Sequence, residues 1–290
     1  MNNKVYPPSE KLREYVLCYI IIDNDFSDID QKVAMDIYPN GLSGICFTFG
    51  DPYFYENDEG RKNHLDAGTV VIGLHDCVFR LYPSQQQKHF VITLKQGVLP
   101  KILNIPMHEI NDQVTDLQYF IKSEEDVIER LLLTNNVTEQ IEIVEEWLTK
   151  KLRSIILYRD ITSCAVSDII SHGGNVKIEE LCRNYGVNKK YMERKFRESI
   201  GISPKKYSEL VKLNTVIDLI ISSYEKQWRE ISTAAGFNDY SHLGKHINKF
   251  TKQSPQMLRQ TLYQSHSQGM ITNNYLGVLS SLCVLNKDIG

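Results

Sequence analysis

Charged side chains between positions 189 and 197 are spaced to share one face of a helix. Lys190, Glu193, Arg194 and Arg197 follow the i, i+3, i+4, i+7 pattern, which places them together on one exposed surface. The planar fork of Arg194 can donate to a pair of acceptors such as O6 and N7 of guanine. Lys190 adds a point charge, and Glu193 adds an acceptor for N4 of cytosine. This face therefore has the chemistry to contact a polyanion and to distinguish base edges.

A second candidate surface lies in the stretch GFNDYSHLGKHINKF, which is basic and holds almost no acid. The exposed face of its expected helix carries Ser241, Gly244, Lys245 and Asn248, with Tyr240 and His242 beside them. Because Gly244 has no side chain and Lys245 is a single point charge, this face suits phosphate contacts more than base readout. The candidate contact residues of both surfaces are Lys189, Lys190, Glu193, Arg194, Arg197, Tyr240, Ser241, His242, Lys245, Asn248 and Lys249.

The two surfaces belong to one unit that occurs twice in the sequence. Four residues of the first copy recur 50 positions later: Glu180, Leu181, Gly186 and Asn188 match Glu230, Ile231, Gly236 and Asn238. Farther along the spacing is 51: Met192, Phe196 and Ser203-Pro204 match Leu243, Ile247 and Ser254-Pro255. The second copy therefore has one extra residue in its turn.

Each copy has the local pattern of two helices joined by a glycine turn. In KIEELCRNYGV the apolar positions predict a short helix, and Gly186 allows the left-handed backbone that ends it. Asn188 is a candidate N-cap of the next helix, whose Met192 and Phe196 point inward. The expected buried residues of the second copy are Trp228, Ile231, Ala235, Phe237, Leu243, Ile247 and Phe250. This pattern predicts two helix-turn-helix motifs.

A longer helix is expected between the two copies, in KKYSELVKLNTVIDLIISS after Pro204. Its buried stripe consists of Tyr207, Leu210, Leu213, Ile217 and Ile220. About 18 residues at ~1.5 Å each make a rod of roughly 27 Å, which approaches the ~34 Å of one turn of B-DNA. One chain could therefore place its two exposed faces in adjacent major grooves.

Residues 177–259 resemble the DNA-binding domain of the AraC-type transcriptional regulators. The resemblance rests on GFNDYSHLGKHINKF followed by SPQMLR, and on the start of the linker helix, GISPKKYSELVKLN. It implies a seven-helix domain, double-stranded DNA as the partner, and sequence-specific transcriptional regulation, with activation favoured over repression. RNA polymerase, a small-molecule effector and a second copy of the chain are the further partners that the resemblance suggests.

The second motif departs from the pattern of this family. Leu243 and Ile247 stand where aromatic side chains are common. Gly244 removes a side chain from the exposed face, and Asn248 replaces a cation that usually binds phosphate. We therefore expect the second motif to contribute less base readout than the first.

The first half of the sequence has the texture of β-strands. Stretches rich in β-branched and aromatic residues cover positions 15–22, 44–50, 68–83 and 89–95, and turn signals such as YPNG and NDEG separate them. Through PPSEKLREYVLCY, YPNGLSGICFTFG and FVITLKQGVLPKILNIPMHEI, this half resembles the small β-rich domain that precedes the DNA-binding domain in one branch of these regulators. The resemblance implies a sensor or oligomerisation module.

The predicted fold class is α+β: an N-terminal β-rich domain, cupin-like or a small barrel, then an all-α domain with two helix-turn-helix motifs joined by a linker helix. We expect the β-rich domain at 1–135, a helical connector at 136–162, the DNA-binding domain at 163–264 and a tail at 265–290. In the connector, Ile141, Val144, Leu148, Leu152 and Ile155 form an apolar stripe. This stripe fits packing on its own domain, with the same helix of a second subunit as the alternative.

Charge is divided unevenly along the 290 residues. Positions 163–260 hold 16 Lys and Arg against 10 Asp and Glu, or +6, so the remainder of a chain with formal charge -3 carries -9. Only the C-terminal part is suited to a polyanion. The six cysteines, Cys18, Cys46, Cys77, Cys164, Cys182 and Cys283, show no CxxC spacing, which is typical of a reducing compartment and of small core residues.

The sequence also indicates a location and argues against other classes. MNNKVYPPSEK has no apolar segment behind a basic start, and the apolar run at 275–285 is too short to span a bilayer, so we expect a cytoplasmic protein with no membrane partner. The sequence has no P-loop, GxGxxG after a strand, GxSxG or HExxH, and no paired carboxylates in a plausible cleft, so we expect neither catalysis nor a cofactor.

Histidines are the remaining candidates for chemistry. His242 and His246 are four apart without a third ligand nearby. His64, His75 and His89 lack the H-x-H spacing of a cupin metal pocket, so no metal is expected. Two alternatives stay open: an interaction module that does not bind DNA, and an enzyme with an unrecognised N-terminal catalytic domain.

Overall fold

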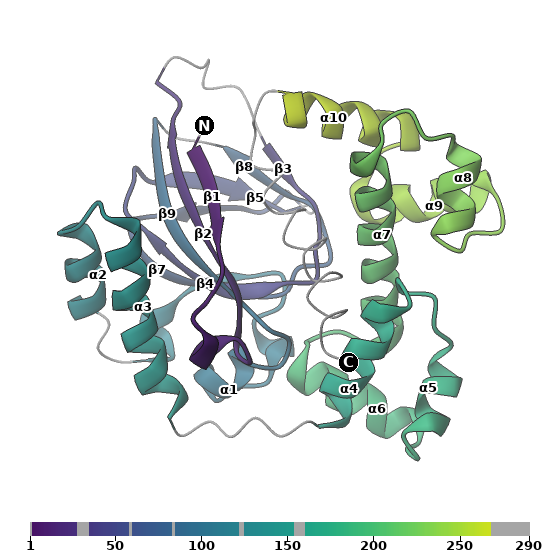
Figure 1. The fold of residues 1–290 in the computed structure, drawn as a ribbon, viewed down its shortest axis with the longest axis horizontal. Coiled ribbons are helices and arrows are strands. Elements are labelled where there is room, and N and C mark those ends of the chain that lie inside the picture. Colours follow the sequence, from purple (N-terminus) through teal and green to yellow (C-terminus); the bar gives the residue numbers. More distant parts are fainter. Residues whose placement is uncertain are drawn as a thin grey trace.

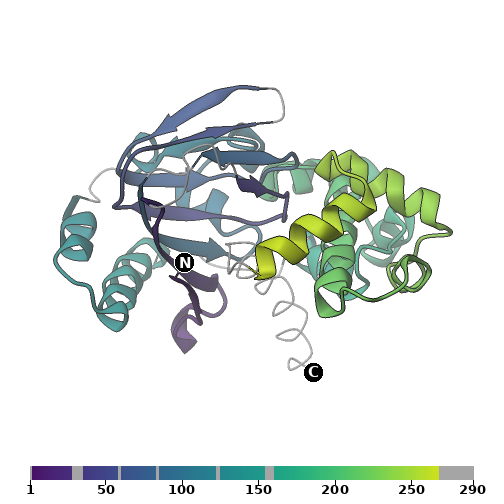
Figure 2. The ribbon, with the colours of Figure 1, turned by 90° about the horizontal axis from the view of Figure 1, so that it is seen from above.

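The computed structural model describes residues 2–27, 35–57, 60–82, 85–121, 125–153 and 160–267. A β-rich domain is formed by the first half of the chain, and an all-helical domain by the residues from Ile161 to Ser267 (Figure 1). Seen from above, the helical domain lies to one side of the β-sheets (Figure 2). The predicted α+β class, β-rich first and helical second, is confirmed.

Two antiparallel sheets make up the β-rich domain. The larger sheet has the order β1-β2-β9-β4-β7-β10, and the smaller has the order β3-β8-β5-β6. The strands are β1 (Asn2–Tyr6), β2 (Val16–Asp25), β3 (Met35–Ile37), β4 (Ser43–Thr48), β5 (Tyr53–Glu56), β6 (Lys62–Leu65), β7 (Gly68–Ile72), β8 (Phe79–Tyr82), β9 (Gln86–Leu94) and β10 (Val114–Asp116). Strand β9 lies between β2 and β4, and its second half is buried, with Ile92 and Leu94 fully enclosed.

The single strand predicted at 68–83 is wrong. The chain forms β7 in the larger sheet, leaves it at Gly73, and enters the smaller sheet as β8. A Cβ at Gly73 would lie 1.9 Å from the carbonyl oxygen of Ile110, so a side chain there could not be accommodated without moving the backbone. His75, Asp76 and Cys77 lie in this connection rather than in a strand. Apolar residues lie on both sides of His75 and Asp76, and their composition does not show which sheet each part joins.

In the described residues before the helical domain there are three α-helices: α1 (Leu99–Leu103), α2 (Glu125–Leu132) and α3 (Val137–Leu152). The Trp147 ring on α3 meets Phe47 of β4 edge-on, with centroids 5.9 Å apart. Val144 and Leu148 are fully buried in the same core. Packing of the connector stripe on its own domain is thus confirmed for these residues, whereas Ile155 lies outside the described residues.

The helical domain contains seven helices within the described range 160–267. They are α4 (Ile161–Ser171), α5 (Ile178–Asn184), α6 (Lys189–Ser199), α7 (Pro204–Ser222), α8 (Trp228–Ala234), α9 (Tyr240–Thr251) and α10 (Pro255–Ser267). Helix α7 runs through the middle, with α5 and α6 near one end and α8 near the other (Figure 1). The predicted stripe of α7, Tyr207, Leu210, Leu213, Ile217 and Ile220, is buried throughout.

Polar contacts join the two domains. The side-chain amide of Asn214 on α7 donates to the carbonyl oxygen of Asn40 at 3.0 Å. Lys206, in the first turn of α7, forms an ion pair with Asp76. His108 Nδ1 lies 3.3 Å from the carbonyl oxygen of Arg197, at the end of α6. The helical domain is therefore fastened to the β-rich domain through α6 and α7.

Asp218 is a charged group placed unfavourably on α7. Its side chain is half-buried, and no described residue forms a hydrogen bond or ion pair with it. Burial disfavours the ionised carboxylate and raises the pKa of Asp218 from 3.8 to about 7. The folded chain therefore holds a proton that the unfolded chain releases near pH 4, and folding loses stability as the pH rises between these values.

Asp218→Asn should remove this loss. Its advantage over wild type in free energy of unfolding should widen by about 1 to 3 kcal/mol between pH 5 and pH 8, since one pKa unit is worth ~1.4 kcal/mol. Denaturant unfolding at both pH values measures the difference. Glu225→Gln, at an exposed residue of the same domain, is the control and should show no such widening. An advantage for Asp218→Asn that does not change with pH would contradict the burial of this carboxylate.

Candidate nucleic-acid interface

The first helix-turn-helix motif is built as its sequence predicts. Helix α5 ends at a turn in which Gly186 has φ +63°, the left-handed region that glycine enters without a Cβ penalty. The Asn188 side chain then accepts a hydrogen bond from the backbone N–H of Tyr191 at 2.9 Å. Its role as the N-cap of α6 is confirmed.

Helix α6 separates its faces cleanly. Met192 and Phe196 are fully buried, and Phe196 packs against the Tyr207 ring of α7 with centroids 6.2 Å apart. Of the predicted contact residues on α6, Lys189, Lys190, Arg194 and Arg197 are exposed and Glu193 is half-buried. Lys190, Glu193, Arg194 and Arg197 therefore share one outward surface, as their spacing predicted, and Lys189 lies beside it.

The cations of this surface differ in what holds them. Arg194 donates to Glu198 at 3.0 Å, and its guanidinium lies 5.2 Å from the centroid of the Tyr191 ring. Lys189 lies 3.5 Å from Glu179. Within the described ranges, no carboxylate pairs with Lys190 or Arg197. The guanidinium of Arg194 is thus held only by weak, exposed contacts with Glu198 and Tyr191 of its own helix, and a stronger acceptor could replace them.

The second motif repeats this geometry with a longer turn. Gly236 has φ +71°, and the Asp239 side chain accepts from the backbone N–H of His242 at 2.7 Å to cap α9. Asp239, rather than Asn238, is therefore the structural counterpart of Asn188. The extra residue predicted for this turn lies between Gly236 and the cap.

The outward face of α9 is less rich in charge than that of α6. Tyr240, Ser241, His242, Lys245, Asn248 and Lys249 are all exposed. Lys249 pairs with Glu209 of α7, and His242 packs its ring against Phe237 at 5.2 Å between centroids. In the described part of the chain, Lys245 has no carboxylate partner. A Cβ at Gly244 would meet only Pro255, at 3.7 Å, so this glycine is not required by packing.

Three residues that the sequence did not single out position the second motif. Lys212 of α7 donates to the carbonyl oxygen of Gly236 at 2.8 Å and lies 4.0 Å from the centroid of the Phe237 ring. The Asn175 side chain donates to the carbonyl oxygen of Ala235 at 3.1 Å. The carbonyl oxygen of Glu209 lies 3.0 Å from His246 Nε2. Nothing in the sequence around Lys212, Asn175 or Glu209 indicates these contacts, because each depends on a residue far away in the chain.

The histidines weighed for metal binding have other surroundings. His246 packs against Phe237 and Phe250, and burial lowers its pKa to about 4. His75 packs against Phe79 and His89 against Tyr53. Among the described residues, no group of three or more histidine, cysteine, aspartate or glutamate side chains is arranged to hold a metal ion. No helix within the same residues has the length and apolar character of a membrane span.

Two family models match separate parts of the chain. Residues 181–261 match a model described as "Helix-turn-helix domain", which covers both glycine turns. Residues 4–116 match a model described as "Domain of unknown function (DUF6597)", which covers the strands of both sheets. No curated protein sequence matches the chain.

Solved structures with a similar arrangement include ToxT from Vibrio cholerae, with 12% identity and a TM-score of 0.49 over 84% of this chain and 98% of ToxT. A structure of unsaturated fatty acid bound ToxT gives 13% identity and a TM-score of 0.41 over 82% and 94% of the two chains. The AraC-like transcriptional activator CuxR gives 12% identity and a TM-score of 0.28 over 67% and 80%.

The helical domain is an AraC-type helix-turn-helix domain, by its matched residues and by its two capped glycine turns. The class of protein that it defines is that of the DNA-binding transcriptional regulators. In this chain the AraC-type helix-turn-helix domain follows a β-rich N-terminal domain.

The two glycine turns should differ in their tolerance of alanine. Gly186→Ala should cost about 1 kcal/mol of stability, because a Cβ there meets nothing within 4 Å and only the left-handed backbone is strained. Gly236→Ala should cost about 1 kcal/mol more, because its Cβ would lie 2.4 Å from the Asn175 side chain and would displace that side chain from the Ala235 carbonyl. Urea unfolding of both variants tests this order, and equal costs would refute the positioning role of Asn175.

Proposed function

We propose that this regulator binds a specific DNA sequence by placing α6 and α9 in two adjacent segments of the major groove, on one side of the duplex. The observation that carries the proposal is that both helix-turn-helix motifs are attached to the single helix α7. The second helix of each motif, α6 or α9, has an exposed basic face on which some cations have no carboxylate partner among the described residues. Helix α7 has 19 residues, a rod of roughly 28 Å at ~1.5 Å per residue. This length approaches the ~34 Å between successive major grooves on one side of B-DNA.

The chemistry of the two faces supports different roles for α6 and α9. Arg194 can exchange its exposed contact with Glu198 for the O6 and N7 atoms of guanine. Lys190 and Arg197 supply cations for phosphates on either side. On α9, Lys245 is the exposed cation that lacks a carboxylate partner among the described residues, while Lys249 is held by Glu209. We therefore assign base readout mainly to α6, and positioning on the phosphate backbone mainly to α9.

The N-terminal domain is proposed to control the DNA-binding domain. It contacts Arg197 of α6, the helix assigned to base readout, and Lys206 and Asn214 of α7, the helix that separates the two motifs. A signal that alters these contacts would change the placement of α6 relative to α9. RNA polymerase, a second copy of the chain and a small-molecule effector remain proposed partners in this scheme, which assigns no catalytic step to the β-rich domain.

Substitutions on the two faces should separate sequence preference from general affinity. Arg194→Ala should cost about 1 to 3 kcal/mol in binding to the preferred site and relax the preference at one or two base pairs. Arg194→Lys keeps the charge but loses the fork, so it should relax the same positions while leaving the salt dependence nearly unchanged. Binding-site selection at two salt concentrations measures both effects.

Lys245→Ala should behave differently, because it removes a phosphate contact. It should weaken preferred and unrelated sites by similar factors and lower the slope of log affinity against log salt by about one unit. Lys101→Ala, at an exposed lysine of α1 in the β-rich domain, is the charge-matched control and should leave the slope unchanged. If Lys245→Ala altered the preferred sequence and Arg194→Ala did not, the assignment of the two helices would be reversed.

A further inference from the structure

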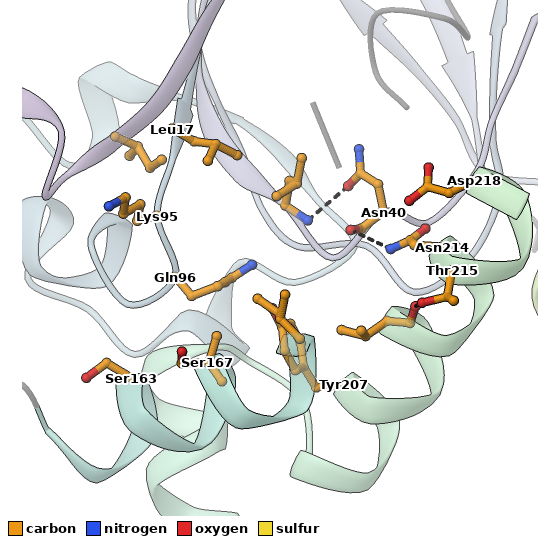
Figure 3. Close-up of a pocket in the computed structure, with 15 residues that line it drawn as sticks. Leu17, Asn40, Lys95, Gln96, Ser163, Ser167, Tyr207, Asn214, Thr215 and Asp218 are labelled. Atoms are coloured by element: carbon orange, nitrogen blue, oxygen red, sulfur yellow. Dashed lines mark hydrogen bonds between the residues drawn. The ribbon is translucent and has the colours of Figure 1, made fainter. Parts of the chain in front are cut away.

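A cavity of about 200 Å³ lies between the two domains (Figure 3). The β-rich domain contributes the buried side chains of Leu17, Leu42 and Leu94 to its wall. The helical domain contributes Val166 and Ile170 of α4 and Val211 of α7. A cavity of ~150 Å³ can hold a molecule the size of benzene, so this space suits a single ring or a short aliphatic chain. Most of the wall is apolar, as in other small-molecule sites.

One end of the cavity collects hydrogen-bond acceptors. Asp218 and Asn214 lie one turn apart on α7 and appear together beside Asn40 (Figure 3). The Asn214 amide nitrogen donates to the Asn40 carbonyl, while its Oδ1 is buried and has no partner among the described residues. The Asp218 carboxyl likewise has no partner there. A carboxylate and an amide oxygen therefore both lack a donor at this end.

We propose that this cavity binds a small amphipathic amine, whose ammonium group is held by Asp218 and whose apolar part lies among the leucine, valine and isoleucine side chains. An ammonium carries three hydrogen-bond donors and a positive charge. Asp218 and Asn214 offer acceptors that lack a donor, and no cation lies at this end of the cavity among the described residues. Its charge offsets the cost of keeping the Asp218 carboxylate half-buried. Asn214 Oδ1, one turn away on the same helix, accepts a second hydrogen bond after a small adjustment of its side chain.

The charges around the cavity favour an amine over an acid. A ligand carboxylate at the acceptor end would face the Asp218 carboxylate across a mostly apolar space. Lys95, the cation among the residues that line this cavity, lies at the opposite end from Asp218 (Figure 3). A neutral alcohol could donate one hydrogen bond but would leave the charge of Asp218 unpaired.

Binding at this place would link the two domains, since both contribute walls. This part of the inference rests on the proposed function, because it makes the amine an effector of DNA binding. A ligand shifts the balance between domain arrangements only by the difference in its affinity for them. An amine that contacts α7 and the β-rich domain together stabilises the arrangement in which the cavity is closed around it.

Three probes with one hydrocarbon chain and different head groups test the ligand class. Hexylamine, 1-hexanol and hexanoate are titrated into the full chain at pH 8 by calorimetry, where the Asp218 carboxyl, with a pKa of about 7, is ionised. We expect hexylamine to bind with a Kd on the order of 1 mM or below, and about tenfold more tightly than the other two. Asp218→Asn should abolish this tenfold preference and leave the affinity for 1-hexanol within about twofold.

Two further variants locate the binding. Glu225→Gln removes an exposed carboxylate elsewhere in the helical domain and should leave all three affinities unchanged. Val211→Phe fills the cavity and should abolish binding of all three probes. Equal affinity for hexylamine and 1-hexanol, tighter binding of hexanoate, an unaltered preference in Asp218→Asn, or no saturation by any probe would each overturn the proposal. DNA affinity, measured on the same samples by fluorescence anisotropy, shows separately whether the proposed function fails.

Discussion

Helix α7 is the constraint on which the arrangement of this protein depends. Its buried stripe must pack at once against α4, α6, α8, α9 and α10, so few of its side chains can change size without disturbing a neighbour. Polar groups on its remaining surface hold specific partners in the β-rich domain and in the second motif. The positions of α6 and α9 are therefore set by one rigid helix rather than by two independent loops.

The contacts of α7 follow one another along its length. Lys206 pairs with Asp76 in the first turn, and Glu209 holds α9 through Lys249 in the next. Lys212 then fixes the second glycine turn, and Asn214 reaches the β-rich domain again. A shift of the β-rich domain would thus act on the same helix that sets the separation of the two recognition surfaces. This shared element is the physical basis for proposing control of DNA binding by the N-terminal domain.

The sequence predicted the helix-turn-helix motifs well because their signals are local. Gly186 and Asn188 act within a few residues of their own positions. The same pattern recurs at 236–255, which supported the prediction of a second motif. The strand prediction at 68–83 was wrong because apolar alternation does not record which of two sheets a strand joins. Asn214 and Asn40 are 174 positions apart, and nothing in either neighbourhood indicates the contact. The cavity between the domains is lined by residues from both of them, so the sequence could not predict it either.

If one chain reads two adjacent segments of DNA through two helices fixed on α7, its contacts in the major groove must fall into two groups. Methylation interference at guanine N7 on a selected binding site locates these contacts, because N7 lies in the major groove. We predict two groups of sensitive positions on the same side of the duplex, with centres about 10 base pairs apart, the group assigned to α6 being the more sequence-dependent. A single group, or two groups on opposite sides of the duplex, would show that α6 and α9 do not read adjacent segments of the major groove.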